Sequence, residues 1–458
     1  MADLHLVVDR AAGGLAGQIA REMRNAVRSG RLVPGARLPA TRDLARDLGL
    51  SRGVVVEAYE QLVAEGLLES RTGAGTRVAA GAGRHASAEQ IPDEPHCWPH
   101  YGHRPTSPDL GAFPRQAWLA AVRHVLATLP NDALDYGDPG GVPALRRELA
   151  AYLGRVRAAD APAELVMIVT GVAQGLSLVV QALVRDRGRR VVLAVEDPTS
   201  ARQIPLLRRA GADTVPVPVD REGIVVGALP GDADAVLVTP AHQYPTGVVL
   251  SPARRAALVE WAARTGALVL EDDYDAEFRF DCDPVGCLQG LAPDRVVLAG
   301  SVSKSLVPGL RLGWIAAPPR VARAVRTARG ELDLGSPVID QYALAHLIAA
   351  GAYDRHLRRM RREYRRRRDA LVGALAEHLP WITVRGISAG LHLYAETDDG
   401  GDPSGLAEAA RAAGLSAEAV TPAHGPPGLV IGFARLPAHR VTEAVRALAG
   451  NVGRDVRG

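Results

Sequence analysis

The sequence almost lacks lysine, and this is the most informative feature of its composition. The chain has 54 strongly basic residues, of which only Lys304 is a lysine. Arginine stands wherever positive charge alone is needed, so the retained lysine is a candidate for chemistry that arginine cannot perform. Arginine stays protonated in proteins, whereas a lysine amine can lose its proton and attack a carbonyl. From composition alone, a surface lysine that survived by chance is the alternative.

Cysteines are also scarce, and long apolar runs are missing. The three cysteines, Cys97, Cys282 and Cys287, show no metal-ligand spacing, which is typical of reduced thiols rather than of disulfides or a metal site. No apolar run reaches the roughly 18 residues of a transmembrane helix, and the first residues show no signal peptide. These absences favour a cytoplasmic protein with no membrane partner. The length of 458 residues predicts two or three domains, and a net charge of +3 does not by itself indicate nucleic-acid binding.

Residues 1–79 predict a small helical domain that ends in a β-hairpin. An apolar repeat that begins at Leu15 indicates the first helix. Thr41 is the expected N-cap of a second helix that ends at Gly49, and Ser51 is the expected N-cap of a third. A glycine-rich turn then joins two short strands, expected at residues 67–71 and 76–79.

The composition changes after this domain. Residues 80–95 are rich in alanine, glycine, serine, proline and charge, which is typical of a flexible linker. In residues 96–452, short apolar runs alternate with helical stretches, which predicts an α/β domain with a mainly parallel sheet. The clearest expected strands are residues 165–169, 191–195, 235–238, 268–270 and 296–298.

The two helices on either side of Gly49 fit a helix-turn-helix, whose second helix lies in the major groove of DNA. Ser51 and Arg52 stand at the start of that helix, where free amides suit phosphate and an arginine suits guanine. Arg42 begins the preceding helix and is placed for the DNA backbone, and the hairpin with Gly75 would form a wing. The alternative is a helical packing domain with solvated arginines.

Residues 34–79 (PGARLPATRDLARDLGLSRGVVVEAYEQLVAEGLLESRTGAGTRVA) closely resemble the winged-helix domain of GntR-type bacterial regulators. The specific landmarks are LPATRDLA, SR, AYEQL, EGLL and a Gly-x-Gly wing. The resemblance implies that Arg42, Ser51, Arg52 and Gly75 belong to the set that contacts operator DNA. The pair Gly53-Val54 departs from the pattern, because a threonine is common at its second position.

Lys304 follows an expected strand and is surrounded by groups that suit a phosphate. It lies in GSVSKSLVPGLRLGW, at a strand-to-loop exit where α/β sheets present their chemistry. Ser301 and Ser303 offer hydroxyl groups, and Arg311 offers charge-assisted hydrogen bonds to a phosphate dianion. An amine beside such a group predicts a site for pyridoxal phosphate.

Two further strand ends fit the same site. Residues 171–175 (GVAQG) follow a strand and open a helix, so their free amides could bind the phosphate. Residues 271–274 (EDDY) end another strand, where a carboxylate could keep the pyridine nitrogen protonated and Tyr274 could bond the ring hydroxyl. Taken singly, such a turn is common, and the carboxylates could be ordinary solvated groups.

Residues 96–450 resemble fold-type I aminotransferases. The landmarks, in order, are YGDPGGVPALRRELAAYL, TGVAQGL, EDPTSARQ, TPAHQYPTG, LEDDYDAEF, SVSKSLVPGLRLGW and IGFARL. EDDYDAEF and TPAHQYPTG look most like the MocR branch of the GntR regulators, in which a winged helix and an aminotransferase-like domain are fused in this order. The resemblance implies a large α/β domain, a small α+β subdomain at the C-terminal end, and pyridoxal 5'-phosphate as cofactor.

The resemblance also assigns roles to individual residues. It implies that Lys304 forms the imine with the cofactor, that Asp272 pairs with the pyridine nitrogen and that Tyr274 lies at the ring hydroxyl. The residues that it places at the phosphate are Ser301, Ser303, Arg311, Val172, Ala173 and Gln174.

Three positions depart from the aminotransferase pattern. Ser200 stands where many relatives stack an aromatic ring on the cofactor, and Tyr244 stands where aminotransferases have an asparagine that bonds the ring hydroxyl. Val430 stands where an arginine usually binds the α-carboxylate of an amino acid, and an apolar residue cannot do so. Arg435 is near in sequence only. The sequence therefore argues against ordinary transamination and against a simple amino-acid effector, and it predicts no catalytic residue.

Three other features carry no assigned chemistry. The arginine-rich helix of residues 355–368 (RHLRRMRREYRRRR) is interpreted as a solvated face, with a second DNA contact as the alternative. His242 is expected to be a structural hydrogen-bonding partner or a neighbour of the cofactor ring. The segment of residues 98–118 is expected to be the first strand and helix of the second domain.

The resulting hypothesis is a transcription regulator that senses a small molecule through Lys304. The effector, an amine or pyridoxal phosphate itself, would shift the DNA-binding and cofactor domains relative to each other. Two winged helices of a head-to-tail homodimer would then meet one double-stranded operator, and control of vitamin B6 synthesis fits the missing carboxylate arginine. One alternative is a working aminotransferase with an appended DNA-binding domain, and another is a DNA-binding protein with a mere dimerisation scaffold.

Overall fold

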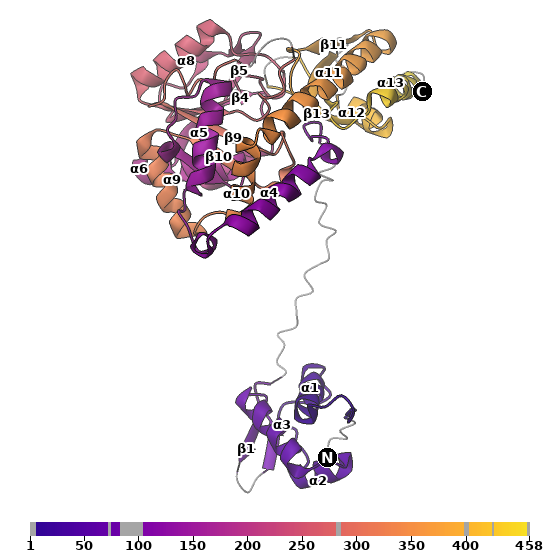
Figure 1. Cartoon of the computed structure of the whole chain (residues 1–458). Helices are drawn as coiled ribbons and strands as arrows, with labels where there is room; N and C mark the ends of the chain where they lie inside the picture. The colour runs from indigo at the N-terminus through magenta and orange to yellow at the C-terminus, as the bar shows by residue number, and fades with distance from the viewer. Residues whose placement is uncertain are drawn as a thin grey trace. The chain divides into compact units, whose positions relative to one another are not determined.

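The computed structural model describes residues 6–71, 75–82, 104–280, 285–397, 403–423 and 426–455. The chain divides into two compact units, Met1–Pro99 and His100–Gly458, which we call the head and the body (Figure 1). Cys97, Cys282 and most of the expected linker lie outside the described residues, whereas Cys287 is a buried free thiol. Within the described part of the chain, no helix is both long and apolar enough to cross a membrane.

The described part of the head contains three helices and a hairpin: α1 (Leu15–Arg28), α2 (Thr41–Leu48), α3 (Arg52–Ala64), β1 (Leu68–Arg71) and β2 (Gly75–Val78). The two strands pair antiparallel and begin and end within one residue of their expected bounds. The turn at residues 72–74, the expected tip of the wing, lies outside the described residues. The head has a hydrophobic core of its own, built from residues 16–82, because the apolar stripes of the three helices face one another.

The turn between α2 and α3 depends on Gly49. This residue has a φ of 61°, and a Cβ there would lie 2.6 Å from the guanidinium of Arg10. Arg10 donates hydrogen bonds to the carbonyls of Leu48 (2.9 Å) and Gly49 (3.1 Å). A left-handed backbone against a bonded side chain admits only glycine at low cost, so the expected helix end at Gly49 is confirmed.

Of the two expected N-caps, one is confirmed and the other is wrong. Ser51 is the N-cap of α3, although its hydroxyl makes no capping hydrogen bond. Thr41 is not the N-cap of α2, because that position belongs to Ala40 and Thr41 is already helical. The Thr41 hydroxyl instead accepts a hydrogen bond of 3.4 Å from Nε of Arg52, at the start of the next helix.

The body is built on an eight-stranded sheet with the order β3-β10-β9-β8-β7-β4-β5-β6. Strands β9, β8, β7, β4 and β5 are parallel, while β10 runs antiparallel to both β9 and β3. The strands are β3 (Val166–Val169), β4 (Val191–Asp197), β5 (Ala212–Asp220), β6 (Gly223–Ile224), β7 (Ala235–Val238), β8 (Leu268–Asp272), β9 (Val296–Ser301) and β10 (Gly313–Ala316).

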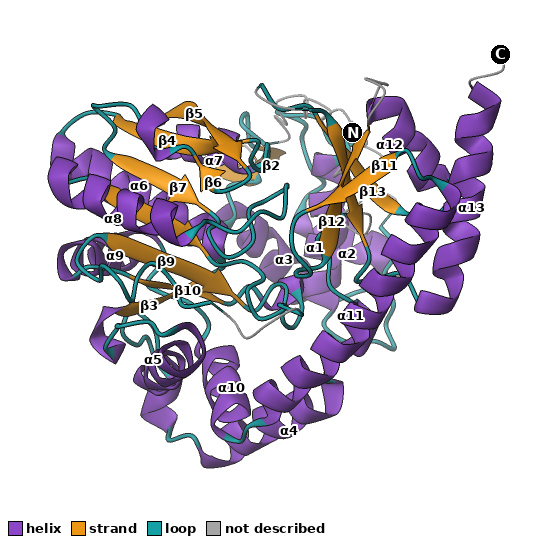
Figure 2. Cartoon of the chain, turned by 90° about the horizontal axis from the view of Figure 1, so that it is seen from above, coloured by secondary structure: helices purple, strands orange, loops and turns teal. Residues whose placement is uncertain are grey.

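Helices cover both faces of this sheet, which explains why its strands read as unbroken apolar runs (Figure 2). One face packs against α6, α7 and α9, and the other packs against α8, α5 and α10. The helices are α4 (Arg115–Thr128), α5 (Pro143–Arg157), α6 (Val172–Arg187), α7 (Gln203–Ala210), α8 (Pro252–Thr265), α9 (Pro319–Leu332) and α10 (Val338–Ala349).

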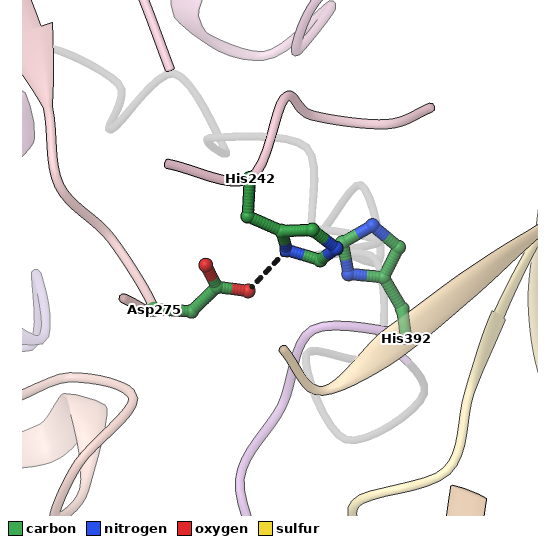
Figure 3. A group of neighbouring side chains, drawn as sticks. All are labelled: His242, Asp275 and His392. Atoms are coloured by element: carbon green, nitrogen blue, oxygen red, sulfur yellow. Dashed lines mark hydrogen bonds and ion pairs between the residues drawn. The ribbon is translucent and has the colours of Figure 1, made fainter. Parts of the chain in front are cut away.

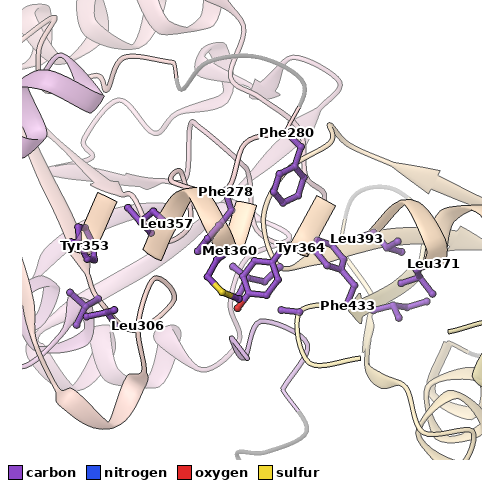
Figure 4. Close-up of a cluster of buried hydrophobic side chains, with 14 of the residues drawn as sticks. Phe278, Phe280, Leu306, Tyr353, Leu357, Met360, Tyr364, Leu371, Leu393 and Phe433 are labelled. Atoms are coloured by element: carbon purple, nitrogen blue, oxygen red, sulfur yellow. The ribbon is translucent and has the colours of Figure 1, made fainter. Parts of the chain in front are cut away.

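A small antiparallel sheet follows, in the order β11-β12-β14-β13, and α11 reaches it from the large sheet. Buried side chains of α11, such as Tyr353, Met360 and Tyr364, join residues of both subdomains in one continuous core (Figure 4). The expected large α/β domain and small α+β subdomain are thus confirmed. The last elements are α11 (Ala352–His378), β11 (Ile382–Arg385), β12 (His392–Thr397), α12 (Pro403–Ala412), β13 (Ser416–Val420), β14 (Gly428–Gly432) and α13 (Ala438–Asp455).

Candidate cofactor site and DNA-binding surface

Lys304 lies in the turn after β9 and is half-buried. Its Nζ donates a hydrogen bond of 3.1 Å to Oγ1 of Thr106. Burial lowers the pKa of Lys304 to about 8, and the positive charge of Arg104 acts in the same direction against the opposing charges of Asp275 and Asp272. An amine with this pKa is unprotonated far more often at neutral pH than an ordinary lysine, so it is prepared to attack a carbonyl.

Asp272 ends β8, beside the strand that leads to Lys304. Its carboxylate is buried, and Oδ2 accepts a hydrogen bond of 2.8 Å from Nε2 of Gln203. The other oxygen, Oδ1, is buried without a partner among the described residues. Burial raises the pKa of Asp272 to about 6, against the lowering effect of Gln203. A buried acceptor that lacks a donor fits a protonated pyridine nitrogen at this point.

The start of α6 and Arg311 lie close together. Gly171, the N-cap of α6, has a φ of 113°, and a Cβ on it would lie 3.0 Å from Nη2 of Arg311. A Cβ on Gly313 would in turn lie 2.7 Å from Cα of Gly171. The first amides of a helix lack intrahelical acceptors, so those of Val172 and Ala173 are available to bind an anion beside the Arg311 guanidinium. This arrangement fits a phosphate.

Gln174 is directed differently from the expectation. Its Oε1 accepts hydrogen bonds from the Thr170 amide (2.8 Å) and from Nη1 of Arg329 (2.6 Å), and its Nε2 donates to Asp333 (3.0 Å). Its own amide bonds the carbonyl of Gly171 at 3.1 Å. Gln174 therefore stabilises the loop before α6. Its side chain and its backbone amide are already bonded within the protein, so neither is available to a phosphate.

The two serines near Lys304 also differ from each other. Ser301 is buried at the end of β9, and its hydroxyl accepts a hydrogen bond of 3.3 Å from the amide of Ser303. The Ser303 hydroxyl, which is half-buried, makes no hydrogen bond within the described chain. We infer that Ser301 holds the turn that carries Lys304 and that Ser303 is the hydroxyl available to a ligand.

His242, Asp275 and His392 form a buried polar cluster (Figure 3), which the half-buried Tyr274 contacts through His242. Nδ1 of His242 lies 2.9 Å from Oδ2 of Asp275 and 3.0 Å from the Tyr274 hydroxyl oxygen. Because the carboxylate is the strongest acceptor nearby, it holds the proton on Nδ1 and fixes the tautomer of His242. The interpretation of His242 as a structural hydrogen-bonding partner agrees with these contacts.

His392 completes the cluster from the small sheet. Its ring centroid lies 5.1 Å from that of His242, and its Nδ1 is buried without a partner among the described residues. Burial, with the charges of His242 and Lys304, lowers the pKa of His392 well below its usual value, so the ring is neutral. The His242, Asp275 and His392 donor atoms lie within 4.8 Å of one another, a spacing that a metal ion could use. We interpret the group as a support for Tyr274, because the Asp275 carboxylate is already bonded and Lys304 is close by.

An apolar residue of the small sheet, Val430, stands at the position where the sequence analysis expects the carboxylate-binding arginine of an aminotransferase. Val430 in β14 pairs with Tyr394 in β12 and is fully buried. Arg435 is exposed after the end of β14. Tyr244 packs edge-on against Tyr274, with ring centroids 6.2 Å apart. Val430 therefore supplies no charged group at this position of β14.

Several residues in the site escaped the sequence analysis. Thr106, which contacts Lys304, lies in the segment 98–118, to which the sequence analysis assigned no chemistry. Gln203 belongs to the EDPTSARQ landmark, where its amide was the available signal. Arg202 forms an ion pair of 2.7 Å with Glu418 and so links the large subdomain to the small one.

The expected DNA-binding residues of the head are all exposed. Arg42, Ser51 and Arg52 are exposed at the starts of α2 and α3, which the Arg52–Thr41 hydrogen bond joins. Gly75, with a φ of 82°, opens β2 and is also exposed. The guanidinium of Arg37, which the sequence analysis did not select, lies 3.6 Å from the place of a Gly75 Cβ and adds a cation beside the hairpin.

The substitution Asp272→Asn tests the pyridine contact. It is expected to weaken binding of pyridoxal phosphate about 10- to 100-fold, because a buried charge-assisted hydrogen bond becomes a neutral one. Titration of the visible absorbance of the protein with cofactor measures the affinity. Asp213→Asn, on the exposed end of an ion pair with Arg190, is the matched control. Equal affinity of the two variants would contradict the assignment.

Two family models match the chain. Residues 15–78 match bacterial regulatory proteins of the gntR family, and residues 108–448 match aminotransferase class I and II. The HTH-type pyridoxine biosynthesis transcriptional regulator PdxR of Corynebacterium glutamicum is 38% identical over 387 residues, which cover 82% of each chain. The probable rhizopine catabolism regulatory protein MocR of Rhizobium meliloti is 32% identical over 97% of this chain and 95% of its own.

Solved structures of aminotransferases share the fold. An archaeal alanine:glyoxylate aminotransferase is 26% identical, with a TM-score of 0.68, over 77% of this chain and 90% of its own. The kynurenine aminotransferase of Pyrococcus horikoshii is 25% identical, with a TM-score of 0.69, over 78% of this chain and 91% of its own.

Proposed function

Because the chain belongs to the MocR-type regulators of the GntR family, we propose that it couples DNA binding by the head to the state of the cofactor site in the body. The head is a winged helix-turn-helix that binds DNA, and the cofactor of the body is pyridoxal 5'-phosphate. When bound, this cofactor supplies an aldehyde to which a lysine amine can bond. Lys304 provides that amine, Asp272 holds the proton on the pyridine nitrogen, and Arg311 with the start of α6 holds the phosphate.

One contact carries the proposal. Nζ of Lys304 donates to Oγ1 of Thr106, which lies two residues after the first described residue of the body, Arg104. This segment leads from the head into the body. Once Nζ bonds to a carbonyl carbon, it can no longer make the same hydrogen bond, so Thr106 and the cofactor compete for one amine. The segment has two arrangements, one with Thr106 bonded to Lys304 and one without this bond. The cofactor therefore binds the two arrangements with different free energies, and a switch requires such a difference.

We propose that the effector is pyridoxal phosphate itself and that the regulated process is vitamin B6 synthesis. Val430 offers no cation to a carboxylate, so an amino acid has no partner at the usual position. The similarity to a pyridoxine biosynthesis regulator supports the same effector. We further propose a head-to-tail homodimer in the cytoplasm, bound at the nucleoid through two heads, and a body used for sensing rather than for turnover.

The direct experiment compares operator affinity with and without pyridoxal phosphate, in the absence of any amino acid. The native chain is expected to show at least a fivefold difference, the lower end of typical allosteric couplings of about 1–3 kcal/mol. Thr106→Val should bind the cofactor but lose most of this difference, because valine keeps the shape and removes the hydroxyl. Fluorescence anisotropy of a labelled operator duplex, selected from random sequences, gives both affinities.

Thr106→Ser is the matched control, since it retains the hydroxyl and should retain the coupling. If Thr106→Val responds to cofactor as fully as the native chain, the coupling does not pass through this contact. If the native chain itself shows equal affinity in both forms, pyridoxal phosphate is not the effector.

Transamination is the second candidate, which the aminotransferase fold and the lowered pKa of Lys304 favour. A panel of amino acids added to the cofactor-loaded protein should leave its visible absorbance unchanged under our proposal. Loss of that absorbance with any amino acid, accompanied by a keto acid, would establish an enzyme with a DNA-binding head.

A further inference from the structure

α11 turns a face made only of arginine to the solvent. From residue 355 to residue 366, every exposed residue is an arginine. At about 100° per residue, they fall within a sector of about 120°, opposite the buried side chains of the same helix. We call this set the arginine row, and its members are Arg355, Arg358, Arg359, Arg362, Arg365 and Arg366.

Most of the positive charge of the arginine row has no acidic partner among the described residues. Glu363 pairs with Arg366 at 2.8 Å. Arg358, Arg362 and Arg365 have no hydrogen bond or ion pair with any described residue. Like charges three and four positions apart on a helix repel each other. The row therefore destabilises its own helix unless an external anion offsets the repulsion.

The segment that leads from the head packs along the same helix. The amide of Asp109 donates to the hydroxyl of Tyr364 (2.9 Å), and its carboxylate pairs with Arg367 (2.9 Å). Arg359, a member of the row, donates to the carbonyl of Ala112 (2.9 Å). Residues 109–112, in the first described segment of the body, thus lie beside the arginine row.

We propose that the arginine row binds the sugar-phosphate backbone of DNA next to the site that the head reads. This inference rests on the proposed function, because it requires the head to bring DNA to the body. Arg355 to Arg366 span about 16 Å along the helix axis at 1.5 Å per residue, which faces several phosphates of a duplex. Guanidinium groups pair with phosphate in two parallel hydrogen bonds, and such contacts carry no sequence information. The row would therefore add affinity and leave operator choice to the head.

The test is the triple variant R358Q/R362Q/R365Q of the full chain. Binding to a fluorescent duplex of arbitrary sequence, about 40 base pairs long, is measured by anisotropy between about 50 and 200 mM KCl. Each lost phosphate contact makes the plot of log affinity against log salt shallower by about 0.9, so a decrease in slope of about two to three is expected. Affinity at the lowest salt should fall at least about tenfold.

The matched control is R209Q/R264Q/R323Q, which removes the same charge from exposed positions on α7, α8 and α9. Its slope should equal that of the native chain. The proposal is overturned if the triple variant keeps the native slope, or if both variants lose slope equally, since the loss would then reflect net charge. Glutamine favours helices, and thermal unfolding with cofactor absorbance verifies the fold of each variant.

A single variant covers the case in which the triple variant unfolds. R362Q should lower the slope by about one, and a native slope there overturns the proposal. If the native chain fails to bind the duplex at any salt concentration, the proposed DNA-binding function fails together with the row. Binding by the native chain with an unchanged slope in the variants rejects the row alone.

Discussion

Lys304→Ala protein, mixed with pyridoxal phosphate and reduced with borohydride, is expected to carry no covalent cofactor, whereas the native chain gains one adduct. The reason is chemical, since no other side chain in the sequence carries a primary amine. Intact mass measures the adduct, and peptide mapping separates Lys304 from the only other amine, at the N-terminus. The visible absorbance of the bound cofactor should also disappear in the variant.

The pH dependence of this reaction gives a second readout. The pKa of Lys304 is lowered to about 8, so the amine is mostly protonated below that pH and mostly free above it. The rate of attachment should rise about tenfold per pH unit below 8 and level off above it. An ordinary lysine would show a rate that still rises toward pH 10. An adduct found only at the N-terminus would contradict the role of Lys304 altogether.

Arg52→Ala is expected to weaken binding of the selected operator about 10- to 100-fold, close to the loss of about 1–3 kcal/mol for an arginine that contacts a base pair. Arg52 is exposed at the first position of α3, and its Nε is fixed by Thr41. This hydrogen bond holds the guanidinium at the N-terminal end of α3, the helix that is expected to enter the major groove. Competition between operator and unrelated duplexes measures the specific part of the loss.

The control for this prediction is Arg21→Ala, which removes an equally exposed arginine from α1. Both variants should bind pyridoxal phosphate as the native chain does, because the body is unchanged. If Arg52→Ala weakens binding to operator and unrelated duplexes by the same factor, Arg52 contacts phosphate and not a base.

The local features of the fold could be predicted from the sequence. The strand at Ala235–Val238 and the end of α2 at Gly49 agree with expectation, because apolar runs and left-handed glycines are read from a few neighbouring residues. Lys304 and Asp272 could be predicted as well, since Asp272 ends β8 and Lys304 follows β9, and these two strands are adjacent in the sheet. The N-cap of α2 could not be predicted, because the Thr41 hydroxyl bonds Arg52 of the next helix instead of an amide of its own helix.

The rest of the site depends on contacts across long stretches of chain. Thr106 reaches Lys304 over 198 positions, and no local pattern marks it. His392 joins the cluster from the small sheet, where only the packing of two subdomains brings it near Tyr274. Gln174 was placed by its position in a loop, but Arg329 from another helix determines where its side chain lies. These residues needed the assembled tertiary structure.

Among the described residues, the hydrophobic core of the head is built from residues 6–82 and the cores of the body from residues 112–452, with no residue in common. A chain organised in this way is modular, because neither half depends on apolar groups of the other to fold. Exchange of the first 82 residues for another winged helix would redirect the protein to new genes and preserve what it responds to. Operator choice and effector response can therefore evolve independently, provided that Thr106 and the segment around it remain part of the body.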